Sequence, residues 1–196
     1  MDSFPAYFPL AGRRVVIVGS GDAADGKARL FEGSPAELVR LDDGRAFDPE
    51  TYRGAALAFI AGEDEAFDAA AAAAAREAGV PVNVVDRPAL CDFFTPALVD
   101  RGEVVAAVGT GGASPVLAQM LRREIEAKVP EGAGRVAALL RQYREEVRQR
   151  FPDMQARSAF LRGVLEGPAA QAALDDDLPL AQRLFRQALD DVASKD

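Results

Sequence analysis

The stretch that decides the fold is Val15-Val16-Ile17-Val18-Gly19-Ser20-Gly21-Asp22-Ala23-Ala24. Its first four residues are apolar and β-branched without a polar break, which is typical of a strand buried in a parallel sheet. Two glycines, one residue apart, follow at once, and residues 25–31 favour a helix. A strand, a glycine-rich turn and a helix in this order match the dinucleotide-binding fingerprint G-x-G-x-x-A.

The fingerprint gives each of its small residues a role. Gly19 permits the tight turn, Gly21 lets the backbone approach a pyrophosphate, and Ala24 keeps the helix close to the strand. The N-terminus of the helix then faces the phosphates. The alternative is that the two glycines only make a turn.

A pair of carboxylates supports the nucleotide interpretation. Asp42 and Asp43 stand about 20 residues after the glycines, at the end of a predicted second strand over residues 37–41. A carboxylate in this place binds ribose hydroxyls and disfavours a 2′-phosphate, so the sequence favours NAD over NADP as cofactor.

The rest of the first half continues the alternation of strands and helices. The seven alanines of residues 69–75 favour a helix over residues 66–78 that packs closely on a sheet. Such alternation predicts an α/β fold with a parallel, Rossmann-like sheet. The further strands are expected at residues 56–61, 82–85 and 104–108.

From Ser114 onwards the pattern is helical. Ser114 is suited to cap a helix whose first turn contains Pro115, and apolar residues then recur at helical spacing. An α/β part is therefore expected to precede an all-helical tail. Further helices are expected at residues 134–151, 154–165 and 178–192.

Composition excludes several classes of function. Among 196 residues there is no histidine, so histidine-based triads, metal sites and proton shuttles are excluded. The net charge of −8 argues against nucleic acid as the main partner. No apolar run approaches the roughly 18 residues of a membrane span, and no signal peptide is apparent. The single Cys91 suits a reducing compartment, so a cytoplasmic location is expected.

The general-base candidate is a carboxylate. Asp86 closes the strand predicted at residues 82–85, at the sheet edge where α/β proteins bind ligands. Asp92 and Asp100 compete for this role, and a loop-capping function is the structural alternative for Asp86. Cys91 has no activating cation near it in sequence and is expected to be a buried structural thiol.

Three features offer places for an anionic ligand. The loop Gly109-Thr110-Gly111-Gly112-Ala113-Ser114 precedes the Ser-Pro helix and resembles an anion-binding loop, or is only a flexible connection. Lys27 could meet a ligand carboxylate, or is a surface lysine. Residues 122–162 carry 10 basic and 6 acidic side chains and could face an anion, or form a solvated helical surface.

Together these motifs resemble the precorrin-2 dehydrogenase/sirohydrochlorin ferrochelatase family, which includes the N-terminal module of bacterial sirohaem synthase. The resemblance covers about residues 1–165 in order. Its most specific blocks are Asn83-Val84-Val85-Asp86 and Thr110-Gly111-Gly112-Ala113-Ser114-Pro115-Val116-Leu117-Ala118; shorter matches include residues 4–10, 16–24, 91–93 and 99–102.

The resemblance implies a homodimer of three parts: an NAD-binding Rossmann-like domain over residues 1–108, a dimerisation segment over 109–130 and a helical domain over 131–196. It implies oxidation of precorrin-2 to sirohydrochlorin with NAD as hydride acceptor. In bifunctional members a metal ion, ferrous or cobaltous, is then inserted into the tetrapyrrole. A fused methyltransferase half has no counterpart in this sequence, so methylation of the precursor is not expected.

The resemblance also assigns residues. The essential aspartate of the family falls on Asp86, and a serine phosphorylated in some members falls on Thr110. The substrate implied by the resemblance carries many carboxylates, so basic side chains and anion-binding loops are expected to contact it. The expected contacts include Lys27 and the loop residues Thr110, Gly111, Gly112 and Ser114. The family's nucleotide contacts fall near Asp22-Ala23 and Asp43-Gly44 and on Ala61-Gly62, in addition to Gly19, Gly21 and Asp42 of the fingerprint. Basic substrate contacts are expected at Arg141, Arg144 and Arg148.

One departure concerns the cofactor side. The path from Asp43 to Phe47 is short, where family members usually place about one more helix and strand. Two consequences are therefore left open: the sheet could lack one edge strand, and the pocket for the adenosine of the cofactor could be more open than in the family. The alternative functions are therefore a chelatase alone, a non-catalytic tetrapyrrole-binding protein on the same scaffold, or a nucleotide-sensing regulatory domain.

Overall fold

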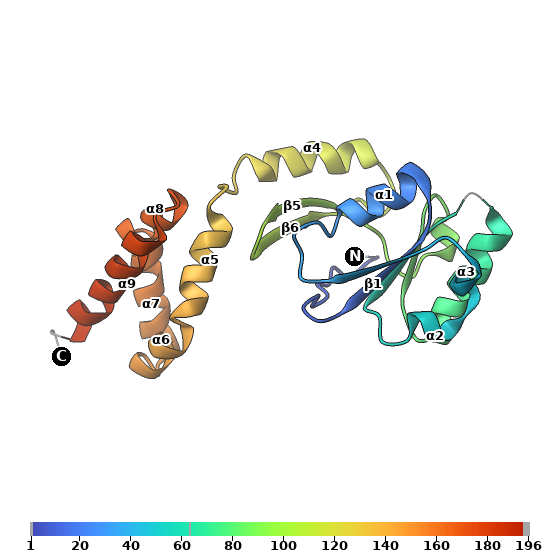
Figure 1. Cartoon of the computed structure of the whole chain (residues 1–196). Coiled ribbons are helices and arrows are strands. Elements are labelled where there is room, and N and C mark those ends of the chain that lie inside the picture. The colour runs from blue at the N-terminus through green and yellow to red at the C-terminus, as the bar shows by residue number, and fades with distance from the viewer. Residues whose placement is uncertain (1, 63, 194–196) are drawn as a thin grey trace. The chain divides into compact units, whose positions relative to one another are not determined.

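The computed structural model of the chain describes residues 2–62 and 64–193 (Figure 1). It contains two units, Met1–Thr95 and Pro96–Asp196. The first is built on a parallel four-stranded sheet in the order β2-β1-β3-β4. Its strands are β1 (Arg14–Gly19), β2 (Glu37–Leu41), β3 (Leu57–Ala61) and β4 (Val82–Val84), and its helices are α1 (Gly21–Arg29), η1 (Gly44–Phe47), α2 (Pro49–Tyr52), α3 (Glu65–Glu77) and η2 (Pro88–Leu90).

The sheet is covered by helices on both faces. Successive residues of a strand point to opposite faces, so Val16 and Val18 pack with the alanines of α3 while Val15 and Ile17 pack with Ala24 of α1. The four apolar side chains of β1, at residues 15–18, are fully buried. The unbroken apolar run at residues 15–18 therefore forms the central buried strand that the sequence predicted.

The alanine run forms α3 and packs on the sheet as expected. Ala71, Ala72 and Ala75 are completely buried against the core. A methyl side chain adds little bulk between helix and sheet, so the helix axis can lie close to the strands.

Among the described residues, β2 is one edge of the sheet. The sequence left open whether a further edge strand is lacking, and in this part of the chain no strand pairs with the outer side of β2. The segment that follows β2 forms η1 and α2 instead. The buried hydroxyl of Tyr52 donates to the carbonyl of Ala46 at 2.7 Å and ties the two short helices together. Asp48 caps α2 by accepting from the Glu50 N–H at 3.0 Å.

The second unit begins with an antiparallel hairpin, β5 (Ala97–Arg101) and β6 (Val104–Val108), which forms its own two-stranded sheet. The prediction that residues 104–108 add a fifth parallel strand was therefore wrong. Asp100 accepts from the Gly102 N–H at 2.8 Å, and Gly102 has a φ of 72°. This tight turn reverses the chain, so β6 pairs with the strand directly before it. The predicted first-domain boundary at residue 108 is at the end of this hairpin, whereas the first unit ends at Thr95.

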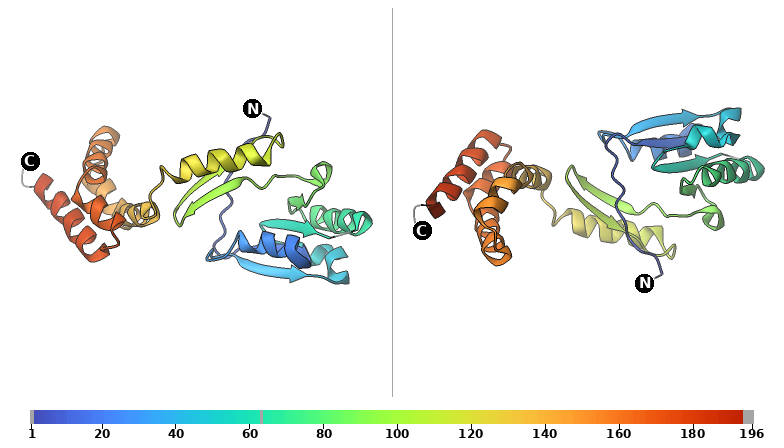
Figure 2. Two further views of the ribbon diagram at one scale, coloured as in Figure 1. Left: turned by 90° about the horizontal axis from the view of Figure 1, so that it is seen from above. Right: turned by 90° about the horizontal axis from the view of Figure 1, so that it is seen from below.

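The rest of the second unit is helical. Helix α4 lies along the hairpin (Figure 2). Ser114 caps it by accepting from the Leu117 N–H at 3.2 Å. None of the helices in the described part has the length and apolar content that a bilayer span requires. The helices are α4 (Pro115–Glu126), α5 (Ala133–Gln142), α6 (Arg144–Arg150), α7 (Met154–Leu165), α8 (Pro168–Leu174) and α9 (Leu178–Ala193).

The helix predicted over residues 134–151 is interrupted at Tyr143, which separates α5 from α6. The ring of Tyr143 stacks on Phe185 of α9, with 4.3 Å between the centroids and 11° between the planes. Both residues belong to the core of the helical part. Tertiary packing thus overrides the helical periodicity at this point.

Candidate functional site

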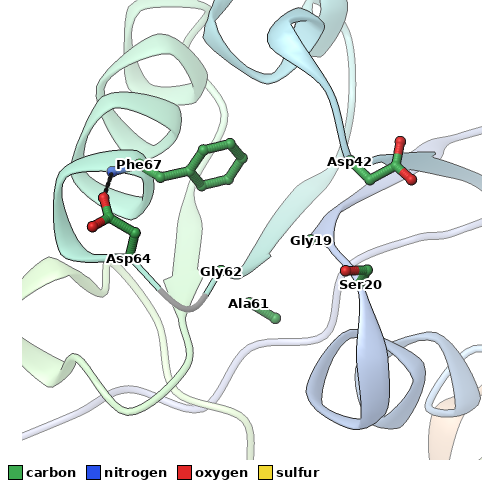
Figure 3. Close-up of a pocket in the computed structure, with 7 residues that line it drawn as sticks. All are labelled: Gly19, Ser20, Asp42, Ala61, Gly62, Asp64 and Phe67. Atoms are coloured by element: carbon green, nitrogen blue, oxygen red, sulfur yellow. Dashed lines mark hydrogen bonds between the residues drawn. The ribbon is translucent and has the colours of Figure 1, made fainter.

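A cleft opens at the carboxyl ends of the first three strands of the sheet. It is lined by Gly19, Ser20, Asp42, Ala61, Gly62, Asp64 and Phe67 (Figure 3). The ends of parallel strands are where open α/β sheets bind ligands. Four of the predicted cofactor contacts, Gly19, Asp42, Ala61 and Gly62, are brought together here although up to 43 residues separate them in sequence.

The glycine turn has the geometry that a pyrophosphate needs. Gly19 has a φ of 107°, and a Cβ there would lie 2.2 Å from the carbonyl oxygen of Ala61, so only glycine permits this approach of the ends of β1 and β3. Helix α1 begins at Gly21, earlier than residue 25 where the sequence placed it, and Ser20 makes no side-chain capping bond. The N–H groups of its first turn, which includes Asp22 and Ala23, therefore lack a side-chain acceptor and are available to an anion.

Two carboxylates border the cleft, on opposite sides of it (Figure 3). Asp42 follows β2, and Asp64, whose carboxylate accepts from the Phe67 N–H at 2.8 Å, follows β3. Asp43 lies outside the lining of this cleft: its carboxylate accepts from the Arg45 backbone and guanidinium, and these bonds lower the pKa of Asp43. Gly44, the first residue of η1, also lies outside it.

A buried carboxylate that the sequence did not single out holds the loops in place. Asp68 is 1% exposed. It accepts from the Gly62 N–H at 2.9 Å and from the Arg87 guanidinium at 2.9 Å. Asp68 thereby links the loop after β3 to the loop after β4, and the ion pair raises the pKa of Arg87.

Asp86 stands in that second loop. Its side chain is exposed and its backbone has a φ of 58°, a conformation uncommon for residues other than glycine. Lys27 of α1 is near enough for its charge to interact with Asp86. Burial lowers the pKa of Lys27, and Cys91 and Asp86 partly offset that effect.

The Lys27 side chain is held in one place. Its ammonium donates to the Thr95 hydroxyl at 3.1 Å and lies 5.5 Å from the centroid of the Phe59 ring. Lys27 is therefore a partly buried, positioned cation, which differs from the surface lysine that the sequence also allowed.

The competitors of Asp86 have structural roles. Asp92 accepts from the Val82 N–H at 3.0 Å and pairs with Arg76, which fixes the start of β4. Asp100 shapes the turn of the β5–β6 hairpin. The thiol of Cys91 lies partly buried at 3.2 Å from both the N–H and the carbonyl of Val84, in line with the expected structural role.

Comparison with known proteins finds family models that match most of the chain. Residues 6–97 match the family model "Putative NAD(P)-binding", residues 107–128 match "Sirohaem biosynthesis protein central" and residues 132–189 match "Sirohaem synthase dimerisation region". The chain belongs to the sirohaem synthase family. This confirms the resemblance found in the sequence, and the first unit is thereby an NAD(P)-binding type of domain.

Relatives of the sirohaem synthase family match over the full chain. It is 38% identical to a siroheme synthase of Stutzerimonas stutzeri and 40% identical to one of Methylococcus capsulatus, in each case over 100% of this chain but only 46% and 45% of the relative. The chain thus spans about half the length of these relatives. A solved structure titled "SirC, precorrin-2 dehydrogenase" has the same fold, with a TM-score of 0.62 at 18% identity over 96% of this chain and 100% of that one.

The predicted substrate contacts of the second unit lie within the regions that match the sirohaem synthase models. The Thr110 hydroxyl lies 3.1 Å from the carbonyl of Ser114 and accepts from its N–H, so Thr110 shapes the loop in which Gly111 and Gly112 have positive φ. Arg141 pairs with Glu103, while Arg144 and Arg148 are exposed on α6. Their contact with substrate stays a prediction. Among the described residues, no three histidine, cysteine or acidic side chains gather as a metal site would require.

Proposed function

We propose that this chain oxidises precorrin-2 to sirohydrochlorin with NAD, as one step of sirohaem biosynthesis. The observation that carries the proposal is the dinucleotide-type cleft at the ends of β1, β2 and β3, in a chain of the sirohaem synthase family. Asp86 follows the neighbouring strand β4, and its charge acts on Lys27. The solved structure of the same fold is titled a precorrin-2 dehydrogenase, which supports the same assignment.

The residues of the cleft fit NAD. The uncapped N–H groups of α1 bind the pyrophosphate, and no atom lies within 4 Å of the place that a Cβ on Gly21 would take, which leaves room for it. Asp42 binds the ribose hydroxyls. A 2′-phosphate would meet the carboxylate of Asp42, so this site prefers NAD to NADP. Bound NAD supplies the acceptor for the hydride that leaves the substrate.

The proton that leaves with the hydride goes to Asp86. Making the ring system more conjugated removes one hydride and one proton, and a single carboxylate can accept that proton. Asp86 is exposed, and within the described residues no hydrogen bond or ion pair occupies its carboxylate. The ammonium of Lys27, anchored by Thr95, binds a carboxylate of the substrate and holds the ring beside Asp86.

The proposal extends to the metal step and to the assembly. Ferrous or cobaltous ion as a second substrate needs no cage of protein ligands, because the tetrapyrrole supplies four nitrogens. The protein is a cytoplasmic homodimer in this proposal. Val116 and Met120 on α4 are 70% and 58% exposed, and the adjoining region matches the family's dimerisation model.

Anaerobic incubation with precorrin-2 and NAD tests the function. Sirohydrochlorin and NADH are expected to appear in equal amounts, and NADP is expected to support a slower reaction. Subsequent addition of ferrous or cobaltous ion tests chelation. Tetrapyrrole binding without formation of NADH would contradict the dehydrogenase and favour a chelatase or a carrier on the same scaffold.

A further inference from the structure

One wall of the cleft is aromatic. Phe67 lies in the first turn of α3, and its ring extends into the space between α3 and Asp42, above Ala61 and Gly62 (Figure 3). Each of the other six lining residues is a glycine, a small residue or a carboxylate. Among the described residues that line the cleft, Phe67 therefore has the one large apolar side chain.

The Phe67 ring contacts a second aromatic side chain. Phe47, the last residue of η1, contacts Phe67 edge to face, with 5.0 Å between the centroids and 71° between the planes. The backbone of Phe67 is fixed by the bond from its N–H to Asp64. Phe67 is partly buried against the core and also lines the cleft. Part of its ring is therefore packed against other side chains, and another part is accessible to a ligand.

The location of the ring fits one part of a dinucleotide. With the pyrophosphate at the N-terminus of α1 and a ribose at Asp42, the attached base must lie beyond Asp42, between the loops after β2 and β3. The Phe67 ring occupies the β3 side of that space. An aromatic side chain offers a base a stacking surface.

We propose that Phe67 stacks on the adenine of bound NAD and that Phe47 supports it. This inference rests on the proposed NAD-dependent function and adds the residue that recognises the base. It also gives the short segment after Asp43 a role. The segment forms η1 where family members usually have an additional helix and strand, and Phe47 of η1 contacts the Phe67 ring. In this proposal the two aromatic side chains border the adenosine side, where the sequence left open a more open pocket.

Ligand binding to the full chain tests the inference without turnover. The affinities of NADH, ADP-ribose and reduced nicotinamide mononucleotide are measured by fluorescence titration or competition for wild type, Phe67→Ala, Phe67→Leu and Phe67→Tyr. We expect Phe67→Ala to weaken NADH and ADP-ribose about tenfold. The mononucleotide, which has no adenine, is expected to bind all variants equally. Phe67→Tyr keeps the ring and is expected to stay within about twofold of wild type.

Further outcomes distinguish failure of the stacking proposal from failure of NAD binding itself. Phe67→Leu keeps apolar volume in the core but has no ring, so a stable Leu variant with unchanged NADH affinity would overturn stacking. An equal loss for NADH and the mononucleotide would also overturn it, because the effect would then be a general distortion of the cleft. If wild type binds neither NADH nor ADP-ribose, the proposed NAD-dependent function fails together with this inference.

Discussion

Asp86 combines an exposed carboxylate with a left-handed backbone, and the two properties can be separated by substitution. Asparagine tolerates positive φ at least as well as aspartate, so Asp86→Asn preserves the loop and removes only the charge. We expect turnover of precorrin-2 to fall by about 10²-fold or more, because the general base is lost, while the tetrapyrrole remains bound. Anaerobic NADH formation and tetrapyrrole titration measure the two effects.

The matched control for this change is Glu77→Gln. Glu77 is an exposed carboxylate at the end of α3, away from the lining of the cleft, and its conversion to an amide is expected to leave turnover unchanged. Normal turnover in Asp86→Asn would show that Asp86 does not accept the proton.

Asp68 shows what a single buried carboxylate does for the site. Asp68→Ala removes the acceptor of both the Gly62 N–H and Arg87, and we expect it to lower the free energy of unfolding by about 2 kcal/mol and to raise the KM for NAD. Asp68→Asn keeps an oxygen for Gly62 and loses the charge that faces Arg87, so its KM is expected to lie between those of wild type and the alanine variant. Urea unfolding and NAD-dependent kinetics give the two values.

Glu65 provides the control on the same partner. Its carboxylate lies 3.4 Å from the Arg87 guanidinium but is 81% exposed, so Glu65→Ala is expected to change stability by less than about 0.5 kcal/mol. An effect as large as that of Asp68→Ala would mean that the ion pair with Arg87, rather than the bond to the Gly62 loop, maintains the site.

At the scale of elements, the segment η1–α2 depends on the buried hydroxyl of Tyr52. Burial raises the pKa of Tyr52 to about 12. Because the folded pKa lies above the ordinary value near 10, the protonated hydroxyl stabilises the fold below pH 10, and this contribution is lost as the pH rises through the folded pKa.

Tyr52→Phe should therefore reverse its effect with pH. Near pH 7 the variant is expected to be about 1 kcal/mol less stable, because the carbonyl of Ala46 loses its donor. Between pH 10 and 12 wild type loses stability that the variant cannot lose, so the difference is expected to shrink and then change sign. Urea unfolding at a series of pH values measures it, and a difference that stays constant with pH would contradict the role of the hydroxyl.

The elements that were predicted correctly have local signals. The β-branched run of β1, the alanines of α3 and the start and end of α7 follow from residues that are adjacent in sequence. The hairpin was missed because the pairing of β6 depends on a turn whose Asp-Arg-Gly sequence does not reveal which strand is the partner. The break at Tyr143 was missed because it depends on Phe185, more than 40 residues away.

The same distinction applies to the site. Gly19 and Asp42 were predictable from the residues, because each stands at the end of a strand and strand ends meet at one edge. Ala61 and Gly62 were predicted only through the resemblance to the family. Neither Asp68 nor Phe67 was predicted to belong to the site, because in sequence they are one carboxylate and one ring at the start of an alanine-rich helix. Only the fold shows that the first faces Gly62 and Arg87 and that the second faces the cleft.

At the scale of the whole molecule, the second unit leaves an apolar surface on α4. Val116, Leu117, Met120 and Leu121 are 44–70% exposed and lie on one face of the helix, while Ala118 on the other side is buried. A contiguous apolar face of this kind is typical of an interface. A two-fold dimer places the same patch of both subunits in contact, so a charge introduced there acts twice.

Met120→Glu tests whether this face joins two copies of the chain. We expect the variant to sediment as a monomer where wild type sediments as a dimer, because two carboxylates would be buried against each other at the interface. Far-UV circular dichroism is expected to be unchanged, since the Met120 side chain makes little contact within its own chain. Gln119→Glu introduces the same charge about 100° around the helix from Met120 and away from the centre of the apolar face, and is expected to remain dimeric. A dimeric Met120→Glu variant would place the subunit contact elsewhere, with the helices α5–α9 as the next surface to examine because they match the dimerisation region.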